Sequence, residues 1–342
     1  MYSISAADSI SLAIQRTREF LFRPFSWGTY LKLGLVAIIT EGIGSNLNSS
    51  RHNGPPAGHG PMIYSPFDIP PVWIAAAVAA VLLVILVSLV VFYLVTRLRF
   101  AFFHCLIHNT SEIGPGWRLY RAQASRFFWL NIGVGFSFLL LLVLAALPFI
   151  GGFVKLFRET PPGGTPDMWL LFTLILPMIP VILLLALIGF ALDVILRDFV
   201  MPHYALEDAT AGEAWLEVWE HIKAEKGQFA VYALLRLILP LAAMIGLFIV
   251  FLIPGLMLAG AGAAIGYAIH SAYADATGAS ALVGIFIQVF FGVIAFGFAL
   301  LIGICLGGPL STGLREYALS FYGGRYQALG EILYPPPAEI AG

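Results

Sequence analysis

The run Pro71–Val95 contains no charged residue, and it constrains the fold of this chain more than any other stretch. A helix rises about 1.5 Å per residue, so roughly twenty apolar residues cross a hydrocarbon core of about 30 Å. The run is therefore long enough to span a bilayer. Trp73 and Tyr93 lie near its ends, where aromatic rings favour the membrane interface, and Arg97 and Arg99 follow where the segment leaves the lipid.

The composition extends this conclusion to the whole chain. Charged residues make up 11% and apolar residues 60% of it, and the mean hydropathy is +0.90, whereas soluble proteins have about 25% charged residues. We therefore predict an all-α fold: a polytopic membrane bundle of six transmembrane helices with amphipathic interfacial helices. No basic domain exists to bind nucleic acid. Cys105 and Cys305 cannot form a disulfide framework, and no signal peptide is evident.

The first predicted span, Trp27–Gly44, is the weakest, because Lys32 and Glu41 leave only LGLVAIIT uncharged between them. We expect Lys32 to snorkel to the inner surface and Glu41 to be a solvated residue near the outer end. Pro254-Gly255 should break the fifth span and leave Gly255–His270 as an outer interfacial or re-entrant helix. The remaining predicted spans are Pro71–Val95, Phe127–Val154, Met168–Leu192, Phe229–Ile253 and Ala281–Leu306.

Amphipathic segments precede the first, third and fifth predicted spans. Asp8–Phe22 has apolar residues at helical spacing, either Asp8 or Ser9 as its N-cap, and Arg23-Pro24 at its end, because proline disfavours helical geometry in the preceding residue. Such helices are expected to lie in the headgroup layer. The segment before the third span carries one apolar face, made of Trp117, Tyr120, Ala124 and Phe127.

The third amphipathic segment, Glu213–Lys226, has an apolar face of Trp215, Trp219 and Ile222, with Glu217 and Glu220 turned away. Basic and aromatic residues at these inner ends suit contact with lipid or with a membrane-protein partner. The predicted interfacial contacts are Arg97, Arg99, Trp117, Trp215 and Trp219.

Lysines and arginines predict the orientation. With the N-terminus inside, all of the 18 lysines and arginines except Arg51, Lys155 and Arg158 lie on the inner side, as does the C-terminus. An amphipathic helix, an outward span, a loop and an inward span recur over 8–110, 111–208 and 209–322, which would make three parallel repeats. The alternative is that the chain contains no true repeat, and that the three helices look alike only because lipid headgroups favour basic and aromatic residues in every interfacial helix. Residues 1–334 form a single membrane domain in either case, with a mobile loop at 42–70 and a disordered tail at 335–342.

Two short motifs carry a resemblance. Leu21-Phe22-Arg23-Pro24-Phe25 before the first span and RLRFAFFHCL after the second resemble motifs of bacterial multi-pass proteins, similar to the membrane domain attached to some glycerophosphodiester phosphodiesterases. The resemblance implies a six-span protein of the bacterial inner membrane with cytoplasmic termini. It does not imply phosphodiesterase activity, because that belongs to a separate soluble barrel that no segment here forms.

His104 and His108 are the candidate metal ligands, because residues at i and i+4 share a helix face. A third ligand for a metal or haem would come from His203 or His221. The alternative is that both imidazoles suit the polarity at the end of a span. A second candidate is an intramembrane ion pair of Asp193 and Arg236, which either couples protons or substrate, or is structural.

Motifs of nucleotide binding, of the serine nucleophile and of redox cysteine pairs are absent, which disfavours an enzyme without excluding one. No catalytic residue and no cofactor is therefore predicted. Gly262–Gly266 and Gly303–Gly307 match the small-xxx-small pattern of close helix packing. The sequence predicts a non-enzymatic membrane protein that contacts lipids or serves as a scaffold for membrane partners. The alternatives are a small-solute or lipid transporter, and a metal- or haem-binding protein.

Overall fold

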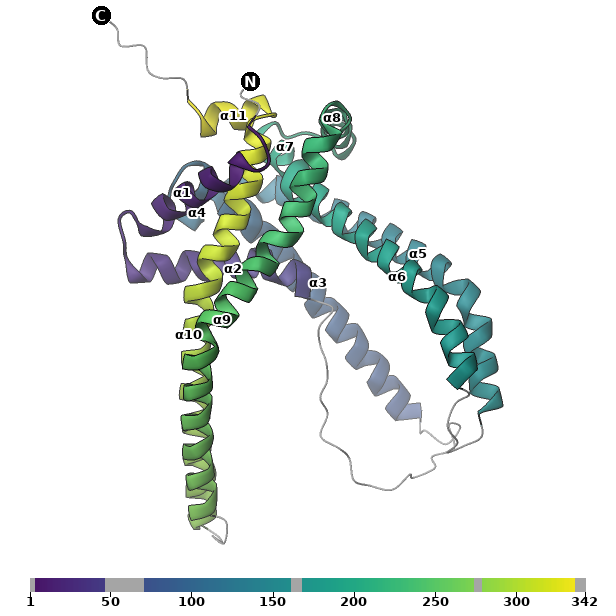
Figure 1. Cartoon of the computed structure of the whole chain (residues 1–342), viewed down its shortest axis with the longest axis vertical. Helices are drawn as coiled ribbons and strands as arrows, with labels where there is room; N and C mark the ends of the chain where they lie inside the picture. The colour runs from purple at the N-terminus through teal and green to yellow at the C-terminus, as the bar shows by residue number, and fades with distance from the viewer. Residues whose placement is uncertain (1–3, 47–70, 161–167, 274–278, 336–342) are drawn as a thin grey trace, which may run out of the picture. The chain divides into compact units, whose positions relative to one another are not determined.

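The computed structural model describes residues 4–46, 71–160, 168–273 and 279–335, and every regular element in these ranges is a helix (Figure 1). The predicted tail at 335–342 lies almost wholly outside the described residues, as does most of the loop predicted at 42–70. The elements are α1 (Asp8–Phe22), α2 (Trp27–Asn46), α3 (Pro71–Ile107), α4 (Ile113–Leu119), α5 (Arg121–Glu159), α6 (Met168–Val194), the π-helix η1 (Ile195–Val200), α7 (Met201–Leu206), α8 (Ala211–Ala224), α9 (Lys226–Ala272), α10 (Ala279–Gly323) and α11 (Gln327–Leu333).

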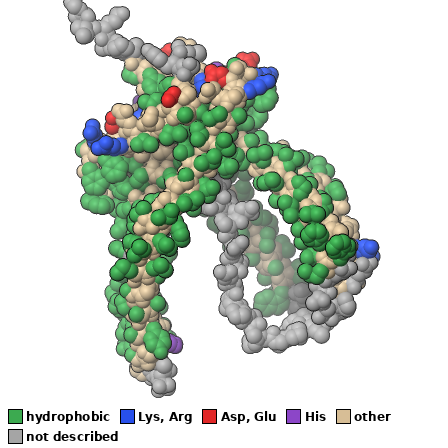
Figure 2. Space-filling model, viewed as in Figure 1, with side chains coloured by type: hydrophobic (Ala, Val, Ile, Leu, Met, Phe, Trp, Pro, Cys, Tyr) green, Lys and Arg blue, Asp and Glu red, His purple; other side chains and the backbone are tan. Residues whose placement is uncertain are grey.

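In the described part of the chain, five helical segments are long and apolar enough to cross a membrane. Their most apolar stretches bury nothing inside the protein, and Figure 2 shows hydrophobic side chains along the lengths of these helices. Exposed apolar helices of this length suggest a membrane protein, because they would be covered by lipid rather than by water. The five segments are Val72–Ile107, Arg121–Leu156, Leu171–Leu206, Lys226–Ala272 and Leu282–Gly323.

Several predicted boundaries are confirmed. α1 spans Asp8–Phe22, as its apolar spacing predicts, and α3 begins at Pro71 as predicted, although it continues beyond the predicted Val95 to Ile107. The N-cap position of α1 is Ala7, so the choice of Asp8 or Ser9 was wrong. The hydroxyl of Ser5 accepts the backbone N–H of Asp8 instead, which satisfies one of the donors left open at the start of the helix.

The predicted break at Pro254-Gly255 is also wrong. α9 runs through Pro240 and Pro254 without interruption, so Gly255–His270 continues the helix of the fifth span. A proline removes one backbone hydrogen bond and normally bends or ends a soluble helix. Membrane helices tolerate proline because neighbouring helices, serine and threonine side chains, ordered waters and small local adjustments satisfy the backbone groups that the proline frees.

Contacts divide the chain into two compact units. Unit 1 consists of Met1–Ser3, Arg118–Ala233 and Phe321–Gly342, and unit 2 of Ile4–Trp117 and Leu234–Ser320. In unit 1, α5 and α6 form a hairpin that leads into η1, α7 and α8 (Figure 1). Aromatic side chains fill the core of unit 1: the ring of Phe199 lies 5.1 Å from that of Tyr232 and 5.0 Å from that of Tyr322.

In unit 2, α2 packs against α3 and α10, and it is not among the five candidate spans. The Tyr30 hydroxyl donates to the Cys305 carbonyl over 2.6 Å, and the Arg99 guanidinium donates to the Thr40 carbonyl over 2.9 Å. Cys305 and Arg99 are both predicted at inner ends of spans. Both ends of α2 therefore contact residues of the same predicted side, so the sixth span is not confirmed.

A close approach of two glycines makes this packing possible. A Cβ on Gly308 would lie 2.7 Å from the Cα of Gly34, so α2 and α10 meet at distances that only glycine allows. Gly307, at the end of the predicted Gly303–Gly307 pattern, faces the Ile38 side chain. The predicted packing at Gly262–Gly266 is not seen, because a Cβ at either end of that pattern would meet nothing within 4 Å.

Candidate functional site

A buried histidine faced by two glutamates forms a polar cluster in unit 1. His203 lies on α7, immediately after the π-helix η1, and its side chain is fully buried. π-Helical turns are rare and occur often at functional sites. Glu207 follows one turn later, at the C-cap of α7, and Glu217 comes from α8.

The turn between α7 and α8 brings the two glutamates to the same imidazole. Asp208 has a φ of 56°, a left-handed conformation that aspartate tolerates better than most residues, and it reverses the chain after Glu207. Thr210 then starts α8 with a capping box, because its hydroxyl accepts the N–H of Glu213 while the Glu213 carboxylate accepts the N–H of Thr210. These hydrogen bonds from Thr210 lower the pKa of Glu213. The start of α8, and with it the position of Glu217, is thus set by local sequence.

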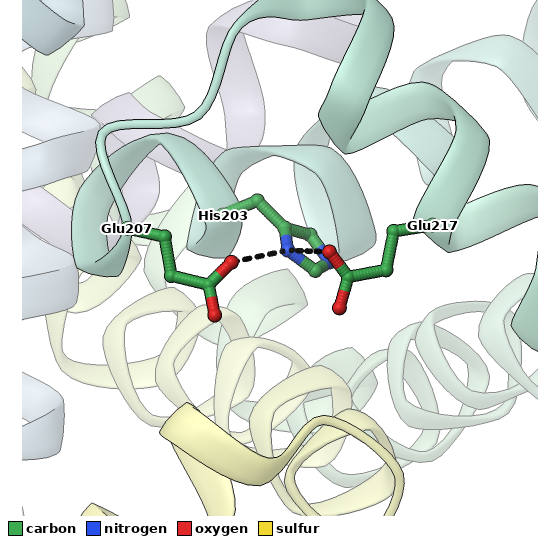
Figure 3. Close-up of side chains that lie close together, drawn as sticks. All are labelled: His203, Glu207 and Glu217. Carbon is green, nitrogen blue, oxygen red and sulfur yellow. Dashed lines mark ion pairs between the residues drawn. The ribbon is translucent and has the colours of Figure 1, made fainter.

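Figure 3 shows both carboxylates directed at one nitrogen of the ring. Nδ1 of His203 lies 3.5 Å from Oε2 of Glu207 and 3.4 Å from Oε2 of Glu217. Nδ1 is buried and makes no hydrogen bond, whereas Nε2 lies 2.7 Å from the Tyr322 hydroxyl. The ring of Tyr326 stacks on the imidazole at 4.1 Å. The cluster therefore holds the imidazole firmly and leaves one nitrogen facing two oxygens.

This cluster is the group of three potential metal ligands in the described residues, with all three ligand atoms within 4.8 Å of one another. Burial, followed by the charge of Glu207, raises the pKa of the Tyr326 hydroxyl. Chemically, the cluster can hold a cation or share a proton.

An apolar pocket of about 440 Å³ lies in unit 2, between the amphipathic helix α1 and helices α9 and α10. The buried hydroxyl of Thr17 borders it and has no hydrogen-bond partner, and Arg18 is its one charged lining residue. Aliphatic side chains dominate the rest. The lining residues are Ile10, Ala13, Ile14, Thr17, Arg18, Phe22, Leu239, Ala243, Pro309, Leu310, Gly313, Leu314 and Tyr317.

The rings of the predicted metal ligands His104 and His108 lie close together, with centroids 4.5 Å apart, although α3 ends at Ile107 and His108 is in the turn that follows. Their proposed third ligands, His203 and His221, belong to unit 1 and not to unit 2. His203 instead faces the two glutamates. Burial lowers the pKa of His221, so its imidazole is neutral near pH 7.

The predicted pair of Asp193 and Arg236 is replaced by two other ion pairs. Arg236 donates to the Glu41 carboxylate over 2.8 Å, and both side chains are buried. Asp193 lies 3.7 Å from Arg197, one turn further along the chain. The prediction that Glu41 is a solvated end residue is wrong, because it neutralises a buried arginine.

The predicted interfacial residues have different environments. Arg97 donates to the Trp117 carbonyl over 2.8 Å and lies 4.3 Å above the Trp117 ring. Arg99 is buried against α2, which removes it from a lipid-contacting surface. On α8 the buried residues are Ala214 and Val218, so Trp219 stays exposed and Trp215 half-buried.

Glu207 and Glu217 were missed by sequence reasoning. Glu207 lies four residues after His203, a spacing that places both on one helix face and was available as a signal. Glu217 had none, since its position on an amphipathic helix predicts a solvated residue. It points to His203 because Ala214 and Val218, rather than the tryptophans, are the face of α8 that packs inward.

Comparison with known proteins assigns the chain to a family. A model of a family of unknown function, DUF7544, matches residues 4–332. The chain belongs to this family. No curated protein and no solved structure matches it. Nothing in these comparisons links the chain to the membrane domains attached to glycerophosphodiester phosphodiesterases, so that resemblance stays a prediction.

Proposed function

We propose that this DUF7544 protein is a non-enzymatic membrane protein that holds a phospholipid in the pocket beside α1. The observation that carries the proposal is the pocket itself, an apolar space of about 440 Å³ with a single charged residue, Arg18, among its lining residues. That combination suits an acyl chain inside and an anionic headgroup at the opening.

The helix that lines the pocket supports this assignment. α1 has an apolar stripe and a charged face, and such helices lie at the boundary of headgroups and acyl chains. Ile14 and Phe22 are exposed on α1 and also line the pocket, so the space opens on apolar surface that needs a lipid cover. An arginine at that boundary keeps its charge among the headgroups while its stem covers apolar surface.

The same proposal includes the orientation. The inner side would hold α1, α8 and α11, the protein would lie in a bacterial inner membrane with cytoplasmic termini, and α2 would pack across the inner ends of α3 and α10. The positive-inside distribution of lysine and arginine supports this arrangement.

Lipid retention tests the function. Gly313 lines the pocket, and a Cβ there would make ordinary contact with Thr17 at 3.5 Å, so Gly313→Leu fills the space from α10. Gly303→Leu is the matched control, because a Cβ at Gly303 on the same helix meets nothing within 4 Å. Native mass spectrometry of protein in mild detergent should show bound phospholipid in the wild type and in Gly303→Leu, and its loss in Gly313→Leu.

Arg18→Gln tests the headgroup. It should reduce retention of anionic phospholipid relative to zwitterionic phospholipid after exchange in mixed vesicles. Equal lipid retention by the wild type and Gly313→Leu would refute the proposal.

A further inference from the structure

We propose that His203, Glu207 and Glu217 bind a divalent transition-metal cation of the zinc class. This site is independent of the lipid pocket and of the predicted His104–His108 pair. The observation that points to a ligand is Nδ1 of His203, which is fully buried, makes no hydrogen bond and faces two carboxylate oxygens. A buried polar atom without a partner costs free energy, and bound ions are one explanation for it.

The hydrogen bond on the other side of the ring defines what Nδ1 can do. When Nε2 carries the proton and donates it to the Tyr322 hydroxyl, Nδ1 presents a lone pair. That lone pair then faces two carboxylate oxygens, and three electron-rich atoms repel one another unless a cation lies between them. A metal-bound imidazole usually donates a hydrogen bond from the N–H of its other ring nitrogen, and this hydrogen bond holds the ring in place.

The distances fit a small metal ion. Zinc binds imidazole nitrogen and carboxylate oxygen at about 2.0–2.2 Å in a tetrahedral arrangement, which separates neighbouring ligand atoms by roughly 3.4 Å. The two nitrogen–oxygen distances are 3.5 Å and 3.4 Å. The glutamate side chains are 43% exposed, so they can adjust while the buried ring stays in place. One imidazole and two carboxylates suit zinc, iron or manganese better than copper(I), which prefers sulfur ligands.

Charge balance favours the same conclusion. The arginines around the cluster are paired elsewhere: Arg325 lies 2.7 Å from the Glu225 carboxylate, and Arg126 pairs with Asp208. The neighbouring His221 carries no charge near pH 7, because burial lowers its pKa. A bound cation, or a proton on His203 itself, would balance the charges of Glu207 and Glu217.

Metal analysis of the full-length protein tests the site. The protein is purified in detergent with a tag that contains no histidine, stripped with a chelator, incubated with zinc chloride and desalted. Elemental mass spectrometry should find about one zinc ion per chain. Glu207→Gln and Glu217→Gln keep the side-chain shape and remove one charged ligand each, so each should weaken zinc binding at least tenfold.

Three further variants make the result specific. Glu220→Gln lies on the same helix outside the cluster and should bind zinc like the wild type, as should the double variant His104→Ala/His108→Ala. Tyr322→Phe removes the hydrogen bond to Nε2 and should weaken zinc binding about 10–100-fold, the usual effect of removing such a partner. Size-exclusion profiles and tryptophan fluorescence verify that each variant is folded.

Two outcomes would overturn the proposal. One is a folded wild type that retains no zinc, iron or manganese, which would mean that a proton on His203 neutralises the glutamates. The other is unchanged zinc binding in Glu217→Gln, which would place the ion elsewhere. Neither outcome affects the lipid pocket, whose lining residues belong to unit 2.

Discussion

The buried ion pair of Glu41 and Arg236 should control the stability of unit 2. Their charged atoms lie 2.8 Å apart, and the side chains are 8% and 3% exposed. Glu41→Gln leaves the guanidinium buried without its counter-charge. Breaking such a pair on one side typically costs about 3–5 kcal/mol, whereas replacing both partners by residues of similar volume is often neutral.

A double-mutant cycle measures this coupling. At about 2–4 °C per kcal/mol, Glu41→Gln and Arg236→Met should each lower the Tm by roughly 6–20 °C. The double variant should lose much less than the sum of the two, because neither charge is left alone. The assay is heat unfolding in detergent, followed by intrinsic tryptophan fluorescence, with concentrations of protein and detergent held constant.

Asp193→Asn is the matched control. The Asp193 side chain is 42% exposed and its partner Arg197 is one turn away, so this variant should cost less than about 1 kcal/mol. It should also add independently to Arg236→Met. Additive effects of Glu41→Gln and Arg236→Met would refute the assignment, and coupling of Asp193→Asn to Arg236→Met would support the pair expected from the sequence.

Two further predictions concern packing and helix capping. Gly308→Ala should destabilise the protein, because the added Cβ would lie 2.7 Å from the Cα of Gly34. Gly303→Ala on the same helix is the control and should be neutral or stabilising, because its Cβ meets nothing within 4 Å. Equal melting temperatures of the two variants would contradict the close approach of α2 and α10. Thr210→Ala should lower stability by about 1 kcal/mol by removing an N-cap. The pKa of Glu213 is lowered in the folded state, so the Glu213 carboxylate stabilises the capping box fully above the ordinary glutamate pKa. This stabilisation is lost as the pH falls through the lowered pKa. Circular dichroism of the wild type and Glu213→Gln in acid would detect the loss.

Local patterns predicted the helices well. Apolar spacing and Arg23-Pro24 define α1, and the charge-free run from Met168 defines α6 to within two residues, whereas α3 begins at the predicted Pro71 but ends twelve residues after the predicted Val95. These patterns predict helices because each residue type suits either lipid or water. The spacing of apolar residues along the chain shows which of the two surrounds each face of a helix. A local rule failed at Pro254, because α9 runs through this proline, as membrane helices can when other groups satisfy the freed backbone.

The candidate site depended on information that the local sequence does not carry. Glu41 and Arg236 are separated by 195 positions, and His203 and Tyr322 by 119. We expected Glu41, near the end of a predicted span, to be solvated, because no local sequence pattern indicates a partner as distant in the chain as Arg236. The π-helix η1 is a second element that the sequence did not predict, and it directly precedes α7, which carries His203.

The sequence by itself predicted helices that are long and apolar enough to cross a membrane, the residues near which most of them begin, and the amphipathic character of α1 and α8. Those properties follow from single segments and their solvent. Only the tertiary structure decided that α2 packs across α3 and α10, that Arg236 pairs with Glu41, and that Glu217 faces His203. The physical reason is that a buried charge takes whichever partner the packing of distant helices brings within reach, and that packing depends on which face of each helix is buried.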